Sequence, residues 1–347
     1  MHAERAEFFA GRSNALQNIS KNVGPFLSLG FLLLQMTTHV SILRLSRSHT
    51  GSLYSSSTVV LLSEIMKLVF CLLYLPYSTS LPLASLLNDH IYNNPKILLQ
   101  LSIPSLLYYI QNNLLIAALS HLPVGTYQAL YQLKILTTAV FSFVFLARRY
   151  TNKQYAALIT LTFGAALCQL SGSEEGNING STQDKMTGVI CVVVASMTSG
   201  FAGVYFEMKL KQAKASLWVR NLQLAVPSTI FAIFGCMGDP SIRANGFFSG
   251  YSFVVLLVIL LQSGGGFLVA IVVSSHSNVA KVITGSLSVI TSSAVGYVFF
   301  DFKPDLMFAL GAAAVVMSAA AYAKNQASPK SVLPTQAPQV LETKQDK

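Results

Sequence analysis

Lys134 is the residue whose surroundings most clearly indicate chemistry. It lies about ten residues into the apolar stretch 124–146, and no acidic residue stands within one helical turn of it. A charged side chain at the depth of a lipid bilayer costs at least about 2.5 kcal/mol, so it must face a cavity or a partner. Because a lysine ammonium can hold a phosphate group as a point charge, we expect Lys134 to contact a buried anionic ligand.

Polar side chains that could contact the rest of such a ligand gather around this lysine. Tyr127, Tyr131 and Lys134 are spaced i, i+4 and i+7, so they share one helical face. Amides can read the edge of a nucleobase, and tyrosines can stack on it or bond a ribose. Hydrogen bonds between helices explain one or two buried amides, but not so many polar groups. The neighbouring apolar stretch 97–119 adds Tyr108, Tyr109, Gln111, Asn112 and Asn113.

Other charged residues also fall within apolar stretches, and the basic ones outnumber the acidic ones by two. Glu64 precedes Lys67 by three residues, so the two side chains can neutralise each other on one helix face. Arg220 stands near the end of its stretch, from which its long side chain can reach the membrane surface. A positive excess of this size suits a ligand that carries about two negative charges. The full set is Lys67, Lys134, Arg220, Lys281, Glu64 and Glu207.

Composition indicates a protein that crosses a membrane several times. The chain has 347 residues, of which 52% are hydrophobic and 10% charged, and its mean hydropathy is +0.55. An ordinary globular domain carries roughly 25% charged residues to cover its surface. The composition therefore argues against a soluble enzyme, a nucleic-acid-binding protein or a disordered scaffold. A helical span needs about 20 mostly apolar residues, and ten windows qualify: 25–43, 55–75, 97–119, 124–146, 152–171, 186–208, 218–237, 251–273, 279–299 and 304–324.

These windows predict an all-α membrane protein with ten transmembrane helices and both termini on one side. With that side in the cytosol, 14 lysines and arginines lie at the cytosolic ends and 5 at the opposite ends, as the positive-inside rule requires. The acidic loop 172–185 then faces the lumen, where Asn179 of its Asn-Gly-Ser sequon is a glycosylation candidate. We expect residues 1–24 to form a cytosolic N-terminal segment and residues 325–347 a disordered cytosolic tail.

The spans divide into two sets of five around this loop, at 25–171 and 186–324. Residues 113–146 and 267–300 align at a constant offset of 154, and each segment contains a short polar break, at 119–124 and 273–279. Many secondary transporters pair inverted repeats that have interrupted helices at corresponding places, with the binding site near the middle of the membrane. We therefore predict two inverted five-helix repeats.

Motifs for other kinds of chemistry are missing from the sequence. It contains no GxxxxGKS/T phosphate loop, no HExxH zinc motif and no GxSxG nucleophile motif. Its histidines have no metal-ligand spacing, and each of its cysteines lies alone in an apolar stretch. The glycines at 264–266 favour close helix packing over a phosphate cradle. We therefore expect no metal, no cofactor and no enzymatic activity.

Several segments resemble the nucleotide-sugar transporter family of the Golgi, in the branch that carries UDP-galactose, UDP-N-acetylglucosamine and CMP-sialic acid. The resemblance covers about residues 25–324. It implies the ten-helix drug/metabolite transporter fold in a multi-pass Golgi membrane protein. It also implies exchange of a cytosolic nucleotide sugar for a lumenal nucleoside monophosphate, with no nucleic-acid partner. The segments are Glu64–Leu68, Tyr109–Leu114, Thr126–Ala139, Ser199–Glu207 and Trp218–Gln223.

The resemblance also implies residue roles, which we combine with those indicated by the polar clusters. The residues expected to hold phosphate are Lys134 and Lys281, with Lys67 nearby. Those expected to meet the base, ribose or sugar are Tyr127, Asn112, Asn113, Tyr108, Gln111, Tyr131, Asn221 and Tyr205. Those expected to form supporting ion pairs are Glu64, Glu207 and Arg220.

Departures from the family pattern bear on the substrate. Ala225 and Pro227 stand where CMP-sialic acid transporters carry a tyrosine and a serine, which favours UDP-galactose or UDP-N-acetylglucosamine exchanged for UMP. Val282 follows Lys281 where the family has glycine, so the geometry around that lysine can differ.

Three alternatives stay open. A CMP-sialic acid/CMP antiporter belongs to the same family, and a drug or metabolite exporter has the same fold, but an exporter is expected to select cations or neutral solutes. An intramembrane transferase would need a carboxylate base near the lumenal face, where Asp301 and Asp305 look like turn residues.

Overall fold

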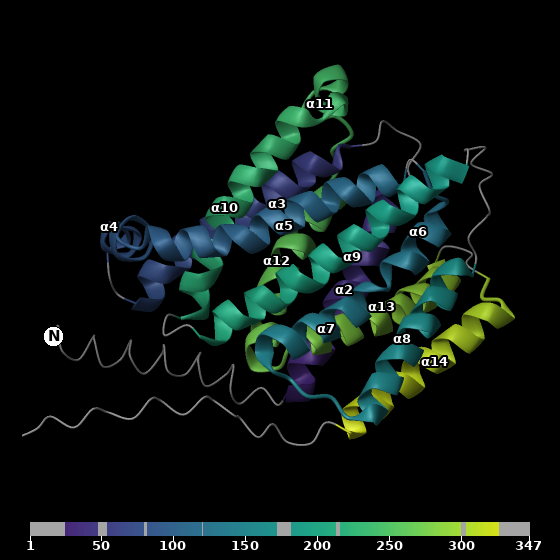
Figure 1. Ribbon diagram of the computed structural model, residues 1–347. Helices are drawn as coiled ribbons and strands as arrows, with labels where there is room; N and C mark the ends of the chain where they lie inside the picture. The colour runs from purple at the N-terminus through teal and green to yellow at the C-terminus, as the bar shows by residue number, and fades with distance from the viewer. Residues whose placement is uncertain are drawn as a thin grey trace, which may run out of the picture.

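The computed structural model describes residues 25–47, 54–79, 82–119, 121–171, 182–212, 216–299 and 303–325. These residues form helices joined by turns and contain no strand, which confirms the all-α class (Figure 1). The predicted N-terminal segment 1–24, the loop residues 172–181 with Asn179, and the predicted tail beyond Asn325 lie outside the described residues.

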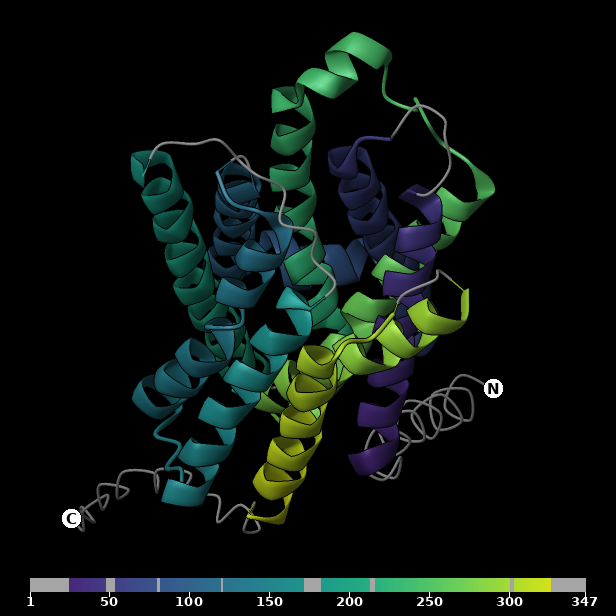
Figure 2. The same ribbon diagram turned by 90° about the vertical axis from the view of Figure 1, so that its right-hand side faces the viewer.

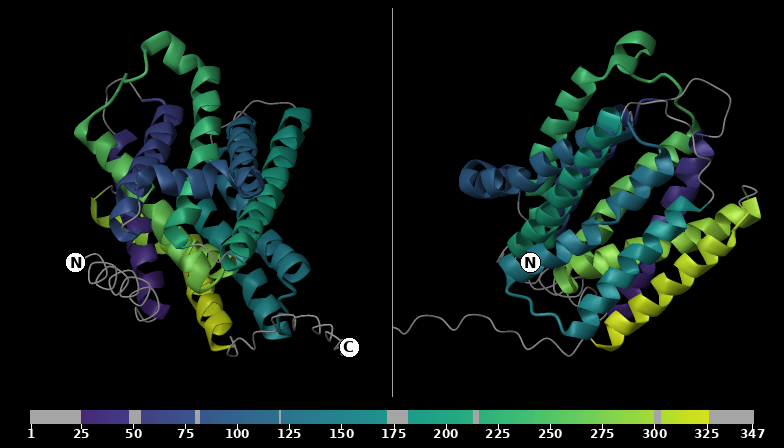
Figure 3. Two further views of the ribbon diagram at one scale, coloured as in Figure 1. Left: turned by 90° about the vertical axis from the view of Figure 1, so that its left-hand side faces the viewer. Right: turned by 45° about the vertical axis from the view of Figure 1, so that its right-hand side comes forward.

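The long helices follow the predicted windows closely. They are α2 (Pro25–Arg47), α3 (Ser56–Thr79), α5 (Pro95–Leu119), α6 (Val124–Tyr131) with α7 (Lys134–Leu146), α8 (Asn152–Leu170), α9 (Thr182–Lys211), α10 (Leu217–Gly238), α12 (Phe253–Ser275), α13 (Asn278–Phe299) and α14 (Leu306–Lys324). The short helices are α4 (Leu83–Leu87), the π-helix η1 (Asn88–Tyr92) and α11 (Pro240–Asn245). In Figures 1 and 3, α4 projects sideways from the bundle, and in Figure 2, α11 lies above the top of α10.

Polar residues just before the apolar stretches start several of these helices. The side chain of Thr151 accepts a hydrogen bond from the Gln154 backbone at the start of α8, in a capping box. The side chain of Ser252 accepts a hydrogen bond from the Val255 backbone at the start of α12, and that of Asp305 accepts one from the Phe308 backbone at the start of α14. Such caps satisfy backbone N–H groups that a helix leaves without partners at its first turn.

Eight helices in the described residues are long and apolar enough to cross a membrane, and the sequence 126–146 counts as one of them. The other two predicted windows, 97–119 and 152–171, are helical as α5 and α8 but are not among the eight. Both carry a run of strongly polar residues, 111–113 in α5 and 152–154 in α8, which lowers their hydropathy. The chain is therefore a multi-pass membrane protein, and the count of ten spans stays a prediction.

The helix expected over 124–146 is interrupted, which the sequence analysis did not foresee. The backbone N–H of Gln132 donates to Ala129 at 3.1 Å, and that of Leu133 to Leu130 at 3.0 Å. These bonds span three residues instead of four, so the chain tightens before α7 begins. Lys134 is consequently the first residue of α7 rather than a residue in the middle of a continuous helix.

The two predicted sets of five helices interlock rather than forming separate bodies. The main contacts join one helix from each set: α2 with α12 and α13, α3 with α10, α5 with α9 and α10, α7 with α9, and α8 with α14. Figures 1 and 2 both show α14 lying along α8. Any site in the middle of the bundle is therefore built by both sets. Whether the sets are inverted repeats stays a prediction.

Small residues allow close contacts between helices of the two sets. A Cβ atom added at Gly164 of α8 would lie 2.9 Å from the carbonyl oxygen of Gly311 in α14. One added at Gly311 would lie 2.8 Å from the carbonyl oxygen of Gly164. Backbone atoms cannot rotate away as a side chain can, so these two helices pack closely because both positions are glycine.

We predict that Gly164→Ala lowers the stability of the protein by about 1–3 kcal/mol, because the added methyl group overpacks the α8–α14 contact. Thermal unfolding of the purified protein in detergent measures this as a lower midpoint. Gly30→Ala in α2 is the matched control, since nothing lies within 4 Å of its added Cβ. Equal unfolding midpoints for the two variants would contradict the close approach.

Candidate functional site

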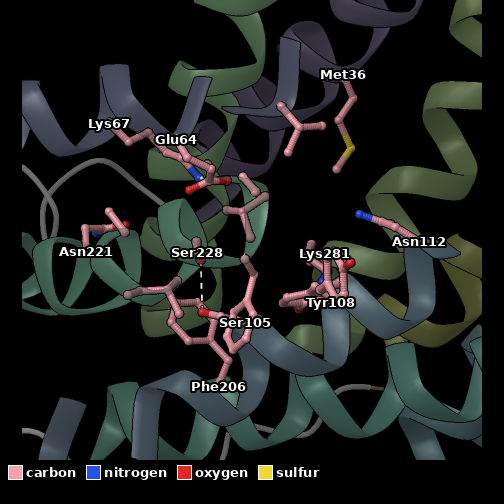
Figure 4. A pocket seen from close by; sticks show the side chains of 18 residues that line it. Met36, Glu64, Lys67, Ser105, Tyr108, Asn112, Phe206, Asn221, Ser228 and Lys281 are labelled. Atoms are coloured by element: carbon pink, nitrogen blue, oxygen red, sulfur yellow. Dashed lines mark hydrogen bonds and ion pairs between the residues drawn. The ribbon is translucent and has the colours of Figure 1, made fainter. Parts of the chain in front are cut away.

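A cavity of about 410 Å³ lies among α2, α3, α5, α9, α10, α12 and α13 (Figure 4). Its wall combines aromatic rings, small residues, and polar or charged side chains. The polar and charged residues are Glu64, Lys67, Ser105, Tyr108, Tyr109, Asn112, Asn221, Ser228 and Lys281. Sites for small ligands typically combine a concave apolar wall with a few such groups.

Lys67 and Glu64 form the ion pair expected from their spacing. The two side chains meet at 2.7 Å on α3 and are 18% and 16% exposed. The stem of Lys67 lies against α12, where a Cβ atom added at Gly266 would be 3.0 Å from its Cδ. Close packing is thus observed at two of the three glycines 264–266: Gly265 leaves room for the side chain of Gln35, and Gly266 for the charged side chain of Lys67.

Lys281 reaches the cavity from the first turn of α13. Within the described part of the chain it forms no ion pair. In Figure 4, Lys281, Tyr108 and Asn112 lie on one side of the cavity, and Asn221 with the Glu64–Lys67 pair lies on the other. A ligand in the cavity would thus have a cation on each side.

Lys134 does not line this cavity. Its ammonium lies 4.1 Å from the centre of the Tyr131 ring, a cation–π contact. The ring of Tyr131 stacks on that of Tyr127 with centres 6.4 Å apart, and its hydroxyl donates to Ser199 at 3.2 Å. Tyr127 and Tyr131 share one face of α6 as predicted, and Lys134 contacts Tyr131 from the first turn of α7. The charges of Lys134 and Lys281 repel each other, so the two lysines lie in one electrostatic environment.

The remaining predicted ligand contacts have different surroundings. Gln111 is buried, and its side-chain oxygen has no hydrogen-bond partner among the described residues. Asn113 is exposed and donates to the Tyr109 carbonyl at 2.8 Å. Tyr205 packs beside Phe201, with the Lys209 ammonium 5.4 Å above its ring. None of the three lines the cavity in Figure 4, whereas the predicted residues Tyr108, Asn112 and Asn221 do.

Two cavity serines were missed by the sequence analysis. Ser105 of α5 and Ser228 of α10 share a hydrogen bond of 2.9 Å across the cavity wall, drawn as a dashed line in Figure 4. Ser228 follows Asn221 by seven residues, which is about two helical turns. That spacing was a signal that both side chains point to one side of α10.

Glu207 forms its ion pairs with two residues outside the set of core cations that the sequence analysis opposed to it. It is fully buried and pairs with Arg148 at 3.0 Å and Lys211 at 2.6 Å. Burial disfavours the charge of Arg148, but the neighbouring Glu207 carboxylate holds the pKa of Arg148 above its ordinary value. Arg220 pairs with no acid in the described residues and donates instead to Gln223 at 2.9 Å.

The charge excess near the cavity is therefore larger than expected. Glu207 attracts Lys281 electrostatically but is paired with Arg148 and Lys211, so Glu64 is the one described acid that pairs with any of the four core cations Lys67, Lys134, Arg220 and Lys281. Such an arrangement favours an anionic ligand.

Comparison with known proteins agrees with this chemistry. The sequence model of a family described as nucleotide-sugar transporter matches residues 21–323. The UDP-N-acetylglucosamine transporter of Rattus norvegicus is 41% identical over 308 residues, which cover 86% of this chain and 94% of that protein. The UDP-galactose translocator of Canis lupus familiaris is 36% identical over 317 residues, covering 90% and 80%.

A crystal structure of another protein supports the fold alone. It superposes with a TM-score of 0.63 at 14% identity, over 86% of this chain and 96% of that one. The family model spans nearly all the described helices, and the sequence relatives cover most of both chains. This chain therefore belongs to the nucleotide-sugar transporter family.

Proposed function

We propose that this protein imports a cytosolic UDP-sugar, either UDP-N-acetylglucosamine or UDP-galactose, into the Golgi lumen in exchange for UMP. The names of the relatives support the substrate class. The observation that carries the proposal is the cavity with Lys67 and Lys281 in its wall, because it offers positive charge, amides and rings to one bound molecule.

We assign the contacts with the substrate to groups that line the cavity and to one group beside it. Lys281, which has no counter-ion among the described residues, holds phosphate. Lys67 adds a second cation when phosphate competes for it with Glu64. Asn112, Asn221 and Tyr108 bond the base, ribose or sugar. Lys134, on its tyrosine pair, holds phosphate from a position next to the cavity rather than in its wall.

Charge balance explains why transport would be an exchange. A nucleotide sugar and a nucleoside monophosphate each carry about two negative charges near neutral pH. The empty cavity leaves several cations unbalanced in an apolar bundle, which is costly. A bound dianion removes most of that cost, so the protein changes its accessible side readily only when it is loaded.

The membrane arrangement belongs to the same proposal. We propose that α5 and α8 also cross the membrane, which completes ten spans in two inverted sets of five. Polar residues in α5 suit a helix that lines a cavity instead of facing lipid. The excess of basic residues at one side supports our proposal that both termini lie in the cytosol.

We predict that Lys281→Ala lowers UMP-driven counterflow of the labelled UDP-sugar by about ten- to a hundredfold, because a hydrogen bond to a charged group is worth about 1.5–3 kcal/mol. Lys134→Ala should abolish counterflow. Uptake into proteoliposomes preloaded with UMP measures both. Lys303→Ala, an exposed lysine outside the helices, is the control. Wild-type exchange by Lys134→Ala would refute the phosphate role of that residue.

We predict that preloading with UMP stimulates uptake of UDP-N-acetylglucosamine or UDP-galactose, and that CMP and GMP do not. The measurement is initial uptake from a panel of labelled nucleotide sugars. Stimulation of CMP-sialic acid uptake by CMP would instead support the CMP-sialic acid/CMP antiporter. Uptake that needs no internal nucleotide would contradict exchange.

Gly266→Ala should raise the KM for the UDP-sugar about fivefold or more, because a methyl group there overpacks against Lys67. Gly264→Ala is the matched control on the same helix, since nothing lies within 4 Å of its added Cβ. Concentration-dependent uptake compares the two variants. Equal KM values would show that the position of Lys67 does not affect substrate binding.

A further inference from the structure

The buried carboxylate of Glu207 joins three separate parts of the chain. Its Oε1 accepts from Arg148 at 3.0 Å, in the connection between α7 and α8, and from Lys211 at 2.6 Å, at the end of α9. Its Oε2 accepts from the backbone N–H of Asn278 at 2.8 Å, at the start of α13. We call Arg148, Glu207, Lys211 and Asn278 the Glu207 cluster.

The cluster ties the two sets of five helices together. Among the described residues, Arg148–Glu207 is the one ion pair that joins separate segments, since the other two lie within α3 and within α9. Lys211 also donates to the carbonyl of His276 at 2.7 Å, between α12 and α13. All these connections lie at the side of the bundle that the basic residues assign to the cytosol.

Helices α9 and α13 are closely packed at the Glu207 cluster. A Cβ atom added at Gly203, one turn before Glu207, would overlap the side chain of Asn278. Both polar atoms of that side chain are buried without a hydrogen-bond partner among the described residues. Burying the amide of Asn278 without hydrogen bonds costs free energy. The contact between α9 and α13 therefore depends for its stability on the hydrogen bonds that Glu207 accepts.

The cluster adjoins the cavity through two residues. Lys281 follows Asn278 by one turn of α13, and Phe206 precedes Glu207 directly in α9; both line the cavity. A carboxylate that accepts from the first N–H of a helix fixes the start of that helix. Movement of α13 away from Glu207 would therefore also move Lys281.

We propose that Glu207 is a positioning residue for transport: its cluster holds the cytosolic side of the bundle closed and fixes α13, and must separate for the cavity to open to the cytosol. This inference rests on the proposed function, because it assumes a cavity that faces the two sides in turn. Glu207 itself does not touch the substrate.

Labelling of Ser277→Cys tests the proposal without depending on transport. Ser277 is 3% exposed and lies between His276 and Asn278. In the purified full chain, a thiol reagent should modify this cysteine slowly while the cluster is closed. Mass spectrometry of the peptide distinguishes it from Cys71, Cys168, Cys191 and Cys236.

In the Ser277→Cys background, Glu207→Gln should speed labelling at least about tenfold, because breaking a buried ion pair shifts the closed state by more than that factor. Arg148→Gln leaves the Lys211 and Asn278 contacts in place and should give a smaller increase. It therefore tests the proposal even if Glu207→Gln does not fold. Lys303→Ala, which removes an exposed charge outside the helices, is the control and should leave labelling unchanged. Equal labelling of the parent and the folded Arg148→Gln variant would overturn the proposal.

Exchange kinetics separate positioning from substrate contact. Arg148→Gln should lower the maximum rate of UMP-driven exchange by about threefold or more while KM stays within about threefold. A large rise in KM at an unchanged maximum rate would place this cluster at the substrate and overturn the proposal. If the wild-type protein does not exchange UMP at all, the proposed function fails, and the labelling rates still decide whether the cluster closes this side.

Discussion

The cost of a charged side chain in an apolar bundle is the constraint on which the site depends. The surroundings of each core lysine offset this cost to a different degree. Lys67 pairs with Glu64 on its own helix, and Lys134 lies on the ring of Tyr131. Lys281 has no ion pair among the described residues and borders the cavity. The lysine without an ion pair or a ring contact among the described residues is thus the one with most to gain from an anionic ligand.

The interlocked helices explain how such a site is assembled. The cavity wall takes α3 and α5 from one set of five and α10, α12 and α13 from the other. Gly266 admits the stem of Lys67 where α3 and α12 meet. Since no single set contains both Lys67 and Lys281, the distance between these cations depends on how the sets pack. A relative movement of the sets would change that distance and thus the affinity for a dianion.

Local spacing predicted the helices and the contacts made along one helix. Apolar windows located the spans, and the Glu64–Lys67 pair and the stacking of Tyr127 on Tyr131 followed from helical periodicity. Contacts between helices were not predictable in this way. The bond between Ser105 and Ser228 and the partners of Glu207 depend on which helices become neighbours. The break before Lys134 carries no glycine or proline to reveal it, since Gln132 and Leu133 are ordinary helix residues.

The true partners of Glu207 also remove a difficulty from the charge argument. The sequence analysis counted this acid against the four core cations. Instead its charge is balanced by Arg148 and Lys211, and it holds α13 through the backbone N–H of Asn278. A backbone contact can fix the helix without occupying the lysine. The same acid can therefore keep one side of the bundle closed while the ammonium of Lys281 stays available to a ligand.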